Sequence, residues 1–421
     1  MAFIKLRTPN GTRDYLPEEV NYCRTLEQTL RETFQKWAYQ EIRTPTIEFV
    51  DLLSKNVGYK LFKQMFKFQD FSGEIIALRP EMTTPIARTV ATNFIENEMP
   101  LRFYYIAKVF RYSRSYTKRG REFRQAGIEL IGRPTLEADG EVLALAIAAL
   151  KSLGIENPRI DIGHATLLKD LLKISGLSDE KQILLKNLLM NRDPCSLESF
   201  LRENQVPQQF NRILNQLMDC RKLAAINNID TSEHPLISQH VYDLQALNQI
   251  LVDYKLTDSV FFDFSLISKI DYYTGLIFEI SIPSVGLVVG SGGRYDKLIG
   301  KFAEETLAAT GFALELEKCS EALRILQPNF LKKERKKILI STSNFTEGIK
   351  LAEKYRAKGC SVALEVQEKE KTILERLAIQ QQFDFIIFLP STQQKEFTIF
   401  DVKSNSYQKQ LAKEFNQMVR S

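Results

Sequence analysis

The apolar positions near the N-terminus have the spacing of a helix. Between Val20 and Tyr39 they recur every three or four residues, which places them on one face of an α-helix. They are Tyr22, Leu26, Leu30, Phe34 and Trp37. The chain then reaches Pro45, and a residue that precedes proline avoids helical backbone angles. We therefore expect a helix followed by an extended segment.

Short runs rich in β-branched and aromatic residues recur from Ile75 onward. Such residues fit the pleated surface of a sheet, so each run predicts a strand. The runs are Ile75–Leu78, Leu101–Ala107, Glu122–Ile131, Val260–Phe264, Leu276–Ile282 and Gly286–Val289. We expect them to form one large, mainly antiparallel sheet.

Leucine-rich segments separate these strands. The first, Glu137 to Leu153, has a helical pattern, and so does most of the stretch from Thr166 to Leu223. Polar turn sequences at Asn191–Pro194 and Asn204–Pro207 divide the second segment into shorter helices. We expect a helical insertion at about residues 166–225, within a sheet domain that covers residues 1–327.

A second domain is predicted after a highly charged stretch. Leu331–Lys337 follows Pro328, and this composition marks residues 328–337 as a linker. In residues 338–421, apolar runs alternate with helical stretches that begin at Glu347, Lys371 and Gln408. The apolar runs are Ile338–Ile340, Ser361–Leu364, Phe385–Phe388 and Phe397–Phe400. This rhythm is typical of a small α/β domain, and the whole chain is predicted to have an α+β fold.

Composition excludes several classes of function. The net charge of +5 is too small to require a nucleic-acid partner. The sequence contains neither a membrane-spanning apolar run nor a secretory signal, so we expect a cytoplasmic protein. The five cysteines are scattered, and the three histidines lack metal-ligand spacing, so neither a metal nor another cofactor is predicted.

Three separated motifs carry the chemical information. They are Leu78–Pro85, then Phe110–Arg114 with Arg121–Glu129, and finally Asp271–Gly275 with Ser291–Asp296. In this order, and with Gly11–Pro17 before them, the sequence resembles the histidyl-tRNA synthetase family over nearly the whole chain. The resemblance implies a class II aminoacyl-tRNA synthetase fold with an antiparallel active-site sheet. It also implies that the C-terminal domain is similar to the family's anticodon-binding module.

The resemblance further implies a pocket for free histidine. It places Glu81, Thr83 and Gln125 around the ammonium, which needs hydrogen-bond acceptors, and Arg111 near the carboxylate. Glu129 and Tyr273 are expected at the imidazole. Tyr272 and Tyr295 complete the candidate set, with Tyr295 closing the pocket. Taken one by one, these residues could equally be solvated carboxylates and ordinary sheet aromatics, and only their joint occurrence favours a pocket.

Four positions depart from the synthetase pattern. Ser113 replaces a glutamate that contacts adenine in the family, and Ser268 replaces an arginine that contacts the substrate carboxylate and the phosphate. In the third motif, which the family places on a helix, Glu315 replaces a small residue and Lys318 replaces an arginine. Amino-acid activation needs preorganised cations at the phosphate, and lysine lacks the planar fork of arginine. We therefore expect no catalytic residues.

A retained amino-acid pocket beside a dismantled nucleotide site resembles a family of non-catalytic synthetase paralogues, the regulatory subunits of ATP phosphoribosyltransferase. This resemblance implies a role in histidine biosynthesis, with free histidine as effector. It implies a short-form catalytic subunit as partner in a hetero-octamer, and a homodimer through the class II interface near Phe34 and Trp37. It implies neither tRNA nor a membrane as partner. The alternative hypothesis is a divergent but active histidyl-tRNA synthetase.

Overall fold

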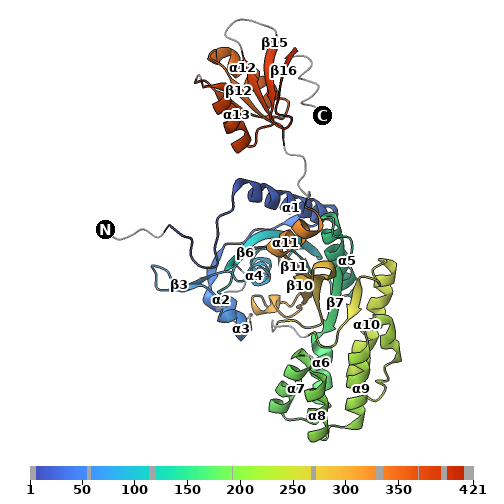
Figure 1. Ribbon diagram of the computed structural model, residues 1–421. Coiled ribbons are helices and arrows are strands. Elements are labelled where there is room, and N and C mark those ends of the chain that lie inside the picture. The colour runs from blue at the N-terminus through green and yellow to red at the C-terminus, as the bar shows by residue number, and fades with distance from the viewer. Residues whose placement is uncertain are drawn as a thin grey trace. The chain divides into compact units, whose positions relative to one another are not determined.

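The computed structural model describes residues 6–54, 58–112, 120–191, 193–266, 272–328, 335–367, 369–389 and 396–411. Ser113 and Ser268 lie outside these residues. The chain divides into two compact units, Met1–Phe330 and Leu331–Ser421, and each is described by itself (Figure 1).

The first unit is built on a sheet of eight strands within the described residues, in the order β1-β5-β6-β11-β10-β9-β7-β8. Only the outermost pairings, β1 with β5 and β7 with β8, are parallel, and all pairings between them are antiparallel. The predicted α+β fold with a mainly antiparallel sheet is confirmed. The strands are β1 Gln40–Glu41, β5 Leu101–Phe110, β6 Glu122–Ile131, β7 Arg159–His164, β8 Val260–Phe262, β9 Leu276–Ile282, β10 Leu287–Arg294 and β11 Ala309–Glu315.

One predicted strand belongs elsewhere. Ile75–Leu78 is strand β4, but it lies between β2 (Ile47–Phe49) and β3 (Lys67–Gln69) in a separate three-stranded sheet. Its partners are close in sequence, and the β3–β4 hairpin turn is stabilised by Asp70, whose Oδ1 accepts the backbone N–H groups of Ser72 and Glu74 at 2.9 Å each. The prediction that this strand joins the large sheet is therefore wrong.

Three helices pack against one face of the large sheet: α1 (Pro17–Lys36), α5 (Leu136–Ser152) and α11 (Leu316–Leu326). In α1, Leu26, Leu30 and Phe34 are at most 1% exposed, and Tyr22 is 6% exposed. The helix ends at Lys36 rather than at Tyr39, because Ala38 has a positive φ of 63°, the left-handed conformation that commonly terminates a helix.

The opposite face of the sheet is covered by α4 (Thr83–Asn93) and the short helix η3 (Ile299–Lys301). Met82, Ile86 and Val90 pack there against side chains of β5 and against Tyr272 and Tyr295. This face holds the candidate site. The short elements outside the two layers are α2 Val50–Ser54, α3 Tyr59–Phe62 and η2 Pro283–Val285.

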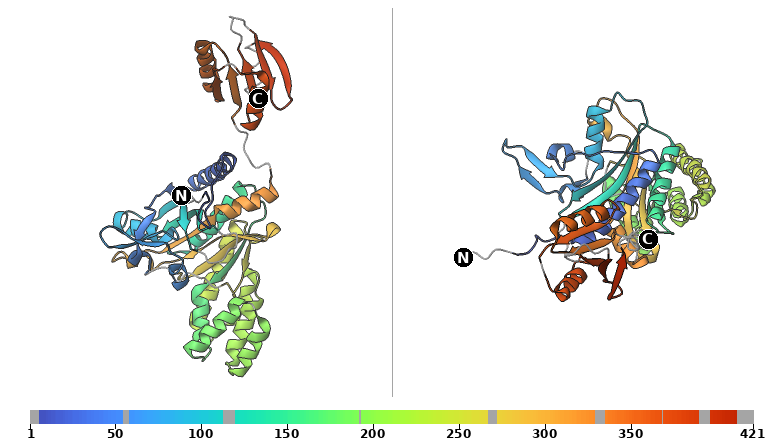
Figure 2. Two further views of the ribbon diagram at one scale, coloured as in Figure 1. Left: turned by 60° about the vertical axis from the view of Figure 1, so that its left-hand side comes forward. Right: turned by 90° about the horizontal axis from the view of Figure 1, so that it is seen from above.

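The helical insertion projects from the edge of the sheet that carries β7 (Figures 1 and 2). It comprises α6 Ala165–Lys173, α7 Asp179–Asn191, α8 Pro194–Glu203, α9 Gln208–Asp219, η1 Leu223–Asn228 and α10 Pro235–Asp253. It therefore continues beyond the predicted limit near residue 225. Its first helix is fixed to the sheet, because Thr166 Oγ1 donates to the carbonyl of Thr274 at 2.6 Å and the N–H of Ala165 donates to that of Gly275 at 2.9 Å.

The second unit contains a five-stranded sheet in the order β13-β12-β14-β15-β16. Its elements are β12 Lys337–Ser341, α12 Phe345–Arg356, β13 Ser361–Glu365, α13 Lys371–Gln380, β14 Phe385–Phe388, β15 Glu396–Asp401 and β16 Ser406–Leu411. The helix expected from Gln408 is wrong, because Gln408 lies in β16 opposite Ile399. The neighbouring Tyr407 ring packs 4.9 Å from Phe400, which favours the strand.

No helix among the described residues combines the length and the apolar character needed to cross a lipid bilayer.

Candidate amino-acid-binding site

The floor of the site consists of small residues on adjacent strands. Gly127 on β6 lies directly opposite Tyr105 on one side and Ala313 on the other, and Gly311 lies opposite Glu129. Residues paired in this way share one face of the sheet. A Cβ atom on Gly311 would lie 2.1 Å from Glu129 Oε2, so only glycine leaves room for the carboxylate.

Glu129 rises from this floor and is only 1% exposed. Thr83 Oγ1 donates to its Oε1 at 2.8 Å, and the hydroxyl of Tyr295 donates to its Oε2. Burial in the low-dielectric interior raises the pKa of Glu129 to about 8, although these two hydrogen bonds act in the opposite direction. A cationic or N–H donor ligand would stabilise the ionised carboxylate.

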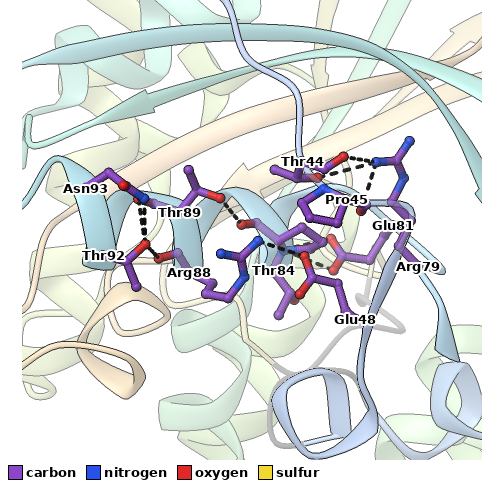
Figure 3. Close-up of polar contacts among 11 residues, drawn as sticks. Thr44, Pro45, Glu48, Arg79, Glu81, Thr84, Arg88, Thr89, Thr92 and Asn93 are labelled. Carbon is purple, nitrogen blue, oxygen red and sulfur yellow. Dashed lines mark hydrogen bonds and ion pairs between the residues drawn. The ribbon is translucent and has the colours of Figure 1, made fainter. Parts of the chain in front are cut away.

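Glu81 contacts the first turn of α4, as Figure 3 shows. Its carboxylate accepts the backbone N–H of Thr83 at 2.6 Å and that of Thr84 at 3.0 Å, which satisfies two donors at the helix N-terminus. Burial raises the pKa of Glu81, and the hydrogen bonds from Thr84 and Thr83 oppose that effect. Glu81 thereby positions Thr83, which in turn holds Glu129.

Arg79 anchors the same segment through its guanidinium, which lies next to Thr44 (Figure 3). Its guanidinium donates to the carbonyls of Lys108 at 2.9 Å, Thr44 at 2.8 Å and Pro45 at 3.1 Å. Arg79 is 6% exposed and makes these contacts entirely with backbone carbonyls and the Thr44 hydroxyl, so its part in the first motif is structural.

Gln125 lies four residues before Glu129 in β6, and Arg111 also lines the site. Gln125 is 6% exposed, and its Oε1 is buried without a hydrogen-bond partner among the described residues. A buried acceptor of this kind needs a donor, which the ammonium of an amino acid would supply. Arg111 donates through Nε to the carbonyl of Pro80 at 2.8 Å, and its guanidinium lies 5.2 Å from the centre of the Phe123 ring.

Three tyrosines form the wall of the site. The ring of Tyr272 lies 5.0 Å from that of Tyr273 and 5.7 Å from that of Tyr295. Burial raises the pKa of all three, and for Tyr273 and Tyr295 the nearby Glu129 carboxylate adds to this effect. The phenols therefore stay neutral and can donate hydrogen bonds.

One cavity is lined by all eight residues that the sequence suggested. They are Glu81, Thr83, Arg111, Gln125, Glu129, Tyr272, Tyr273 and Tyr295. Sequence reasoning missed Met82 and Tyr105, which also line it. The alternation of side chains along β5 could have indicated Tyr105. It lies opposite Gly127, and Gln125 and Glu129, two residues to either side of Gly127, share its face of the sheet.

Comparison with known proteins shows the family to which the chain belongs. A sequence model described as histidyl-tRNA synthetase matches residues 11–319. A protein of Halothermothrix orenii named ATP phosphoribosyltransferase regulatory subunit is 34% identical over 372 residues, which covers 87% of each chain. A Clostridium novyi protein of the same name is 33% identical over 416 residues and 96% of each chain. The chain belongs to the ATP phosphoribosyltransferase regulatory subunit family.

Solved structures agree with this assignment. A Bacillus halodurans structure titled ATP phosphoribosyltransferase regulatory subunit/histidyl-tRNA synthetase has a TM-score of 0.80 and 30% identity, and the match covers 92% of this chain and 99% of that one. Histidyl-tRNA synthetase from Nostoc has the same TM-score at 18% identity, with 99% of each chain covered, and thus shares the fold. Regulatory subunits of this family therefore keep the architecture of the synthetase.

In this member of the regulatory-subunit family, an ion pair occupies the position next to Gln125. Glu315 lies directly opposite Gln125 and shares its face of the sheet. Lys318 Nζ lies 3.0 Å from Glu315 Oε2 and donates to the carbonyl of Val288 at 2.8 Å. The end of the third motif lies on a helix as expected, because Lys318 is in α11, which begins at Leu316, whereas Glu315 is the last residue of β11.

The described residues contain no group of three or more His, Cys, Asp or Glu side chains that could hold a metal ion.

Proposed function

We propose that this chain is the non-catalytic regulatory subunit of a short-form ATP phosphoribosyltransferase, and that it binds free histidine in the cavity at Glu129. Histidine binding would mediate feedback on the catalytic subunit in the first step of histidine biosynthesis. The observation that supports this most strongly is the convergence of all eight candidate residues on one cavity.

The polar groups in the cavity complement an amino acid with a nitrogen-containing ring. The buried Gln125 Oε1 lacks a donor among the described residues, and Glu81 lies on the same cavity wall, so this end suits an ammonium. Arg111, on the same cavity, suits a carboxylate. Glu129 suits an imidazole N–H, because its carboxylate is held in place by Thr83 and Tyr295.

The proposed absence of catalysis rests on the surroundings of Gln125. Glu315 brings a carboxylate to the face of the sheet where an activated amino acid would meet a phosphate, and like charges repel. Lys318 is held by Glu315 and by the carbonyl of Val288, so its ammonium is directed to protein groups. Losing one preorganised charge stabiliser costs about 10²- to 10³-fold in rate.

Titration calorimetry with histidine tests the proposed ligand. Glu129→Ala removes a charge-assisted hydrogen bond, which lowers affinity by about ten- to a hundredfold. Glu156, an exposed residue after α5, provides the control, since Glu156→Ala should bind as the wild type does. If Glu129→Ala binds histidine with wild-type affinity, or if the wild type alone and in its complex binds none, the cavity is not the histidine site.

The alternative, a divergent histidyl-tRNA synthetase, is tested by histidine-dependent exchange of pyrophosphate into ATP. We expect no exchange above a buffer blank. If the wild type shows robust exchange and Glu129→Ala abolishes it, the chain is an active histidyl-tRNA synthetase instead.

A further inference from the structure

The helical insertion contains a second cavity, and no described residue lines both this cavity and the one at Glu129. It is lined by residues of α7, α8 and α9 and of the turns that follow α7, α9 and β8 (Figure 1). Neither the sequence motifs nor the names of the relatives assign a ligand to this part of the chain. Its lining residues therefore have to be considered for their own chemistry.

Most of the lining is apolar. Leu189 of α7 and Leu197 of α8 are 1% and 5% exposed, and Leu188 and Met218 extend the apolar surface. A hydrocarbon group that enters such a cavity is removed from water together with the side chains that it covers, which favours binding. This part of the cavity suits an aliphatic or aromatic group.

Two carboxylates also line the cavity, and each is held in place by a nearby serine. Asp193 precedes α8, where its Oδ1 accepts the backbone N–H of Ser196 at 3.0 Å and its Oδ2 accepts the Ser196 hydroxyl at 2.6 Å. Asp263 follows β8 and is 6% exposed, and its Oδ1 accepts the backbone N–H and the hydroxyl of Ser265 at 3.0 and 2.6 Å. A carboxylate oxygen accepts more than one hydrogen bond, so both groups can also receive a ligand ammonium.

Arg221, directly after α9, brings a positive charge to the same cavity. Its carbonyl accepts the backbone N–H of Phe262 at 2.9 Å, which fixes it beside the residue that precedes Asp263. Within the described part of the chain, its guanidinium takes part in no ion pair or hydrogen bond. The planar guanidinium matches a carboxylate through two parallel N–H groups.

We propose that this cavity binds a free α-amino acid with an apolar side chain. The ligand carboxylate pairs with Arg221, its ammonium faces Asp193 and Asp263, and its side chain packs against the leucines and Met218. Charge complementarity selects this class. An apolar carboxylate without an ammonium would meet two uncompensated carboxylates, and an apolar amine would leave the guanidinium without an anion. The inference goes beyond the proposed function and does not depend on it.

The test is calorimetry of the full chain with L-leucine and with L-phenylalanine. Arg221→Ala should lower the affinity for both by about ten- to a hundredfold, because it removes a charged hydrogen bond. Arg221 is exposed, so this variant should keep the melting temperature of the wild type. Asp193→Asn should also weaken binding, since asparagine still caps α8 but does not carry the negative charge.

Arg202→Ala is the matched control. Arg202 is an exposed arginine of α8 outside the lining, 3.3 Å from Glu198, and its removal should leave leucine affinity unchanged. Saturating histidine should not displace leucine, because the two amino acids occupy separate cavities.

Four outcomes would overturn the proposal. They are a wild-type protein that binds neither leucine nor phenylalanine, equal leucine affinity in Arg221→Ala and wild type, displacement of leucine by histidine, and an affinity for 4-methylpentanoate equal to that for leucine. The last result would identify the ligand as an apolar carboxylate. If leucine binds as expected but the wild type binds no histidine, alone or in its complex, only the proposed function fails.

Discussion

The hydroxyl of Tyr295 donates to the carboxylate of Glu129, a residue 166 positions earlier in the chain. Glu129 is thereby held on one side by Tyr295 and on the other by Thr83 of α4. Both donors are neutral, so in the unliganded protein the buried carboxylate has hydrogen bonds but no adjacent cation among these partners. Its ionisation therefore costs folding free energy, and a ligand can offset that cost.

Glu129→Gln should remove this pH-dependent cost. The pKa of Glu129 is raised from 4.5 to about 8 in the folded protein, so its stabilising contribution is complete below pH 4.5 and is lost as the pH rises through 8. The variant should therefore become progressively more stable than the wild type between pH 5 and pH 9. The gain is on the order of a few kcal/mol, measured by urea unfolding across that range without histidine. A constant difference between the two proteins would contradict the assignment.

Asp139→Ala should destabilise the first unit. Arg294 donates through Nε to Asp139 Oδ2 at 3.0 Å, and the two residues are 9% and 2% exposed. Removing the carboxylate leaves a buried guanidinium with weaker compensation, at a cost of about 3 to 5 kcal/mol in the free energy of unfolding. The control is Asp161→Ala, which breaks the partly exposed pair with Arg159 at 2.6 Å. We expect that control to change stability by about 1 kcal/mol or less.

His164→Asn should protect the protein against mild acid. The His164 Nδ1 accepts the N–H of Leu167 at 3.1 Å and caps α6, a role that requires a neutral ring. Burial, followed by the neighbouring His240, lowers the pKa of His164 from 6.5 to about 3, although Asp170 opposes this. The stabilising contribution is therefore present above pH 6.5 and is lost as the pH falls toward 3.

Asparagine can cap the helix without titrating. Between pH 7 and pH 5 the wild type should lose about 2 kcal/mol more stability than His164→Asn. Parallel losses in the two proteins over this range would show that the ring is accessible to protons in the folded state.

The chain should assemble with a catalytic partner. A retained pocket regulates catalysis only if histidine has different affinity for two states of a larger complex. We expect the chain to co-purify with a short-form ATP phosphoribosyltransferase catalytic subunit, to raise that subunit's activity, and to make the activity sensitive to histidine. Co-expression, size-exclusion chromatography and a phosphoribosyl-ATP assay measure all three. Separate elution with an unchanged rate and histidine response would refute the proposal.

Much of the fold was predictable because its strands carry strong local patterns. Glu122–Ile131 and Leu276–Ile282 coincide with β6 and β9. In contrast, β11 was missed because residues 309–315 include Gly311 and end in Glu315, a composition unlike a strand. Gly311 is nevertheless required there by the proximity of Glu129, a constraint that arises only when distant strands pair.

The candidate site was predictable as a set of residues but not as a set of contacts. Glu81 was assigned to the ligand ammonium, whereas the structure shows in addition that it caps α4 through Thr83 and Thr84. Only the alternation of side chains along its strand indicates Tyr105, and a tyrosine in a strand usually packs in a core. Its place in the cavity depends on strand register, which local sequence does not determine.

The floor of the cavity joins strands from two distant parts of the chain. β5 and β6 end at Ile131, whereas β10 and β11, which complete the floor, begin at Leu287 and end at Glu315. A nascent chain that has emerged only through the helical insertion thus lacks half of the binding surface. The complete cavity can therefore form only after the chain up to Glu315 has been synthesised and has folded.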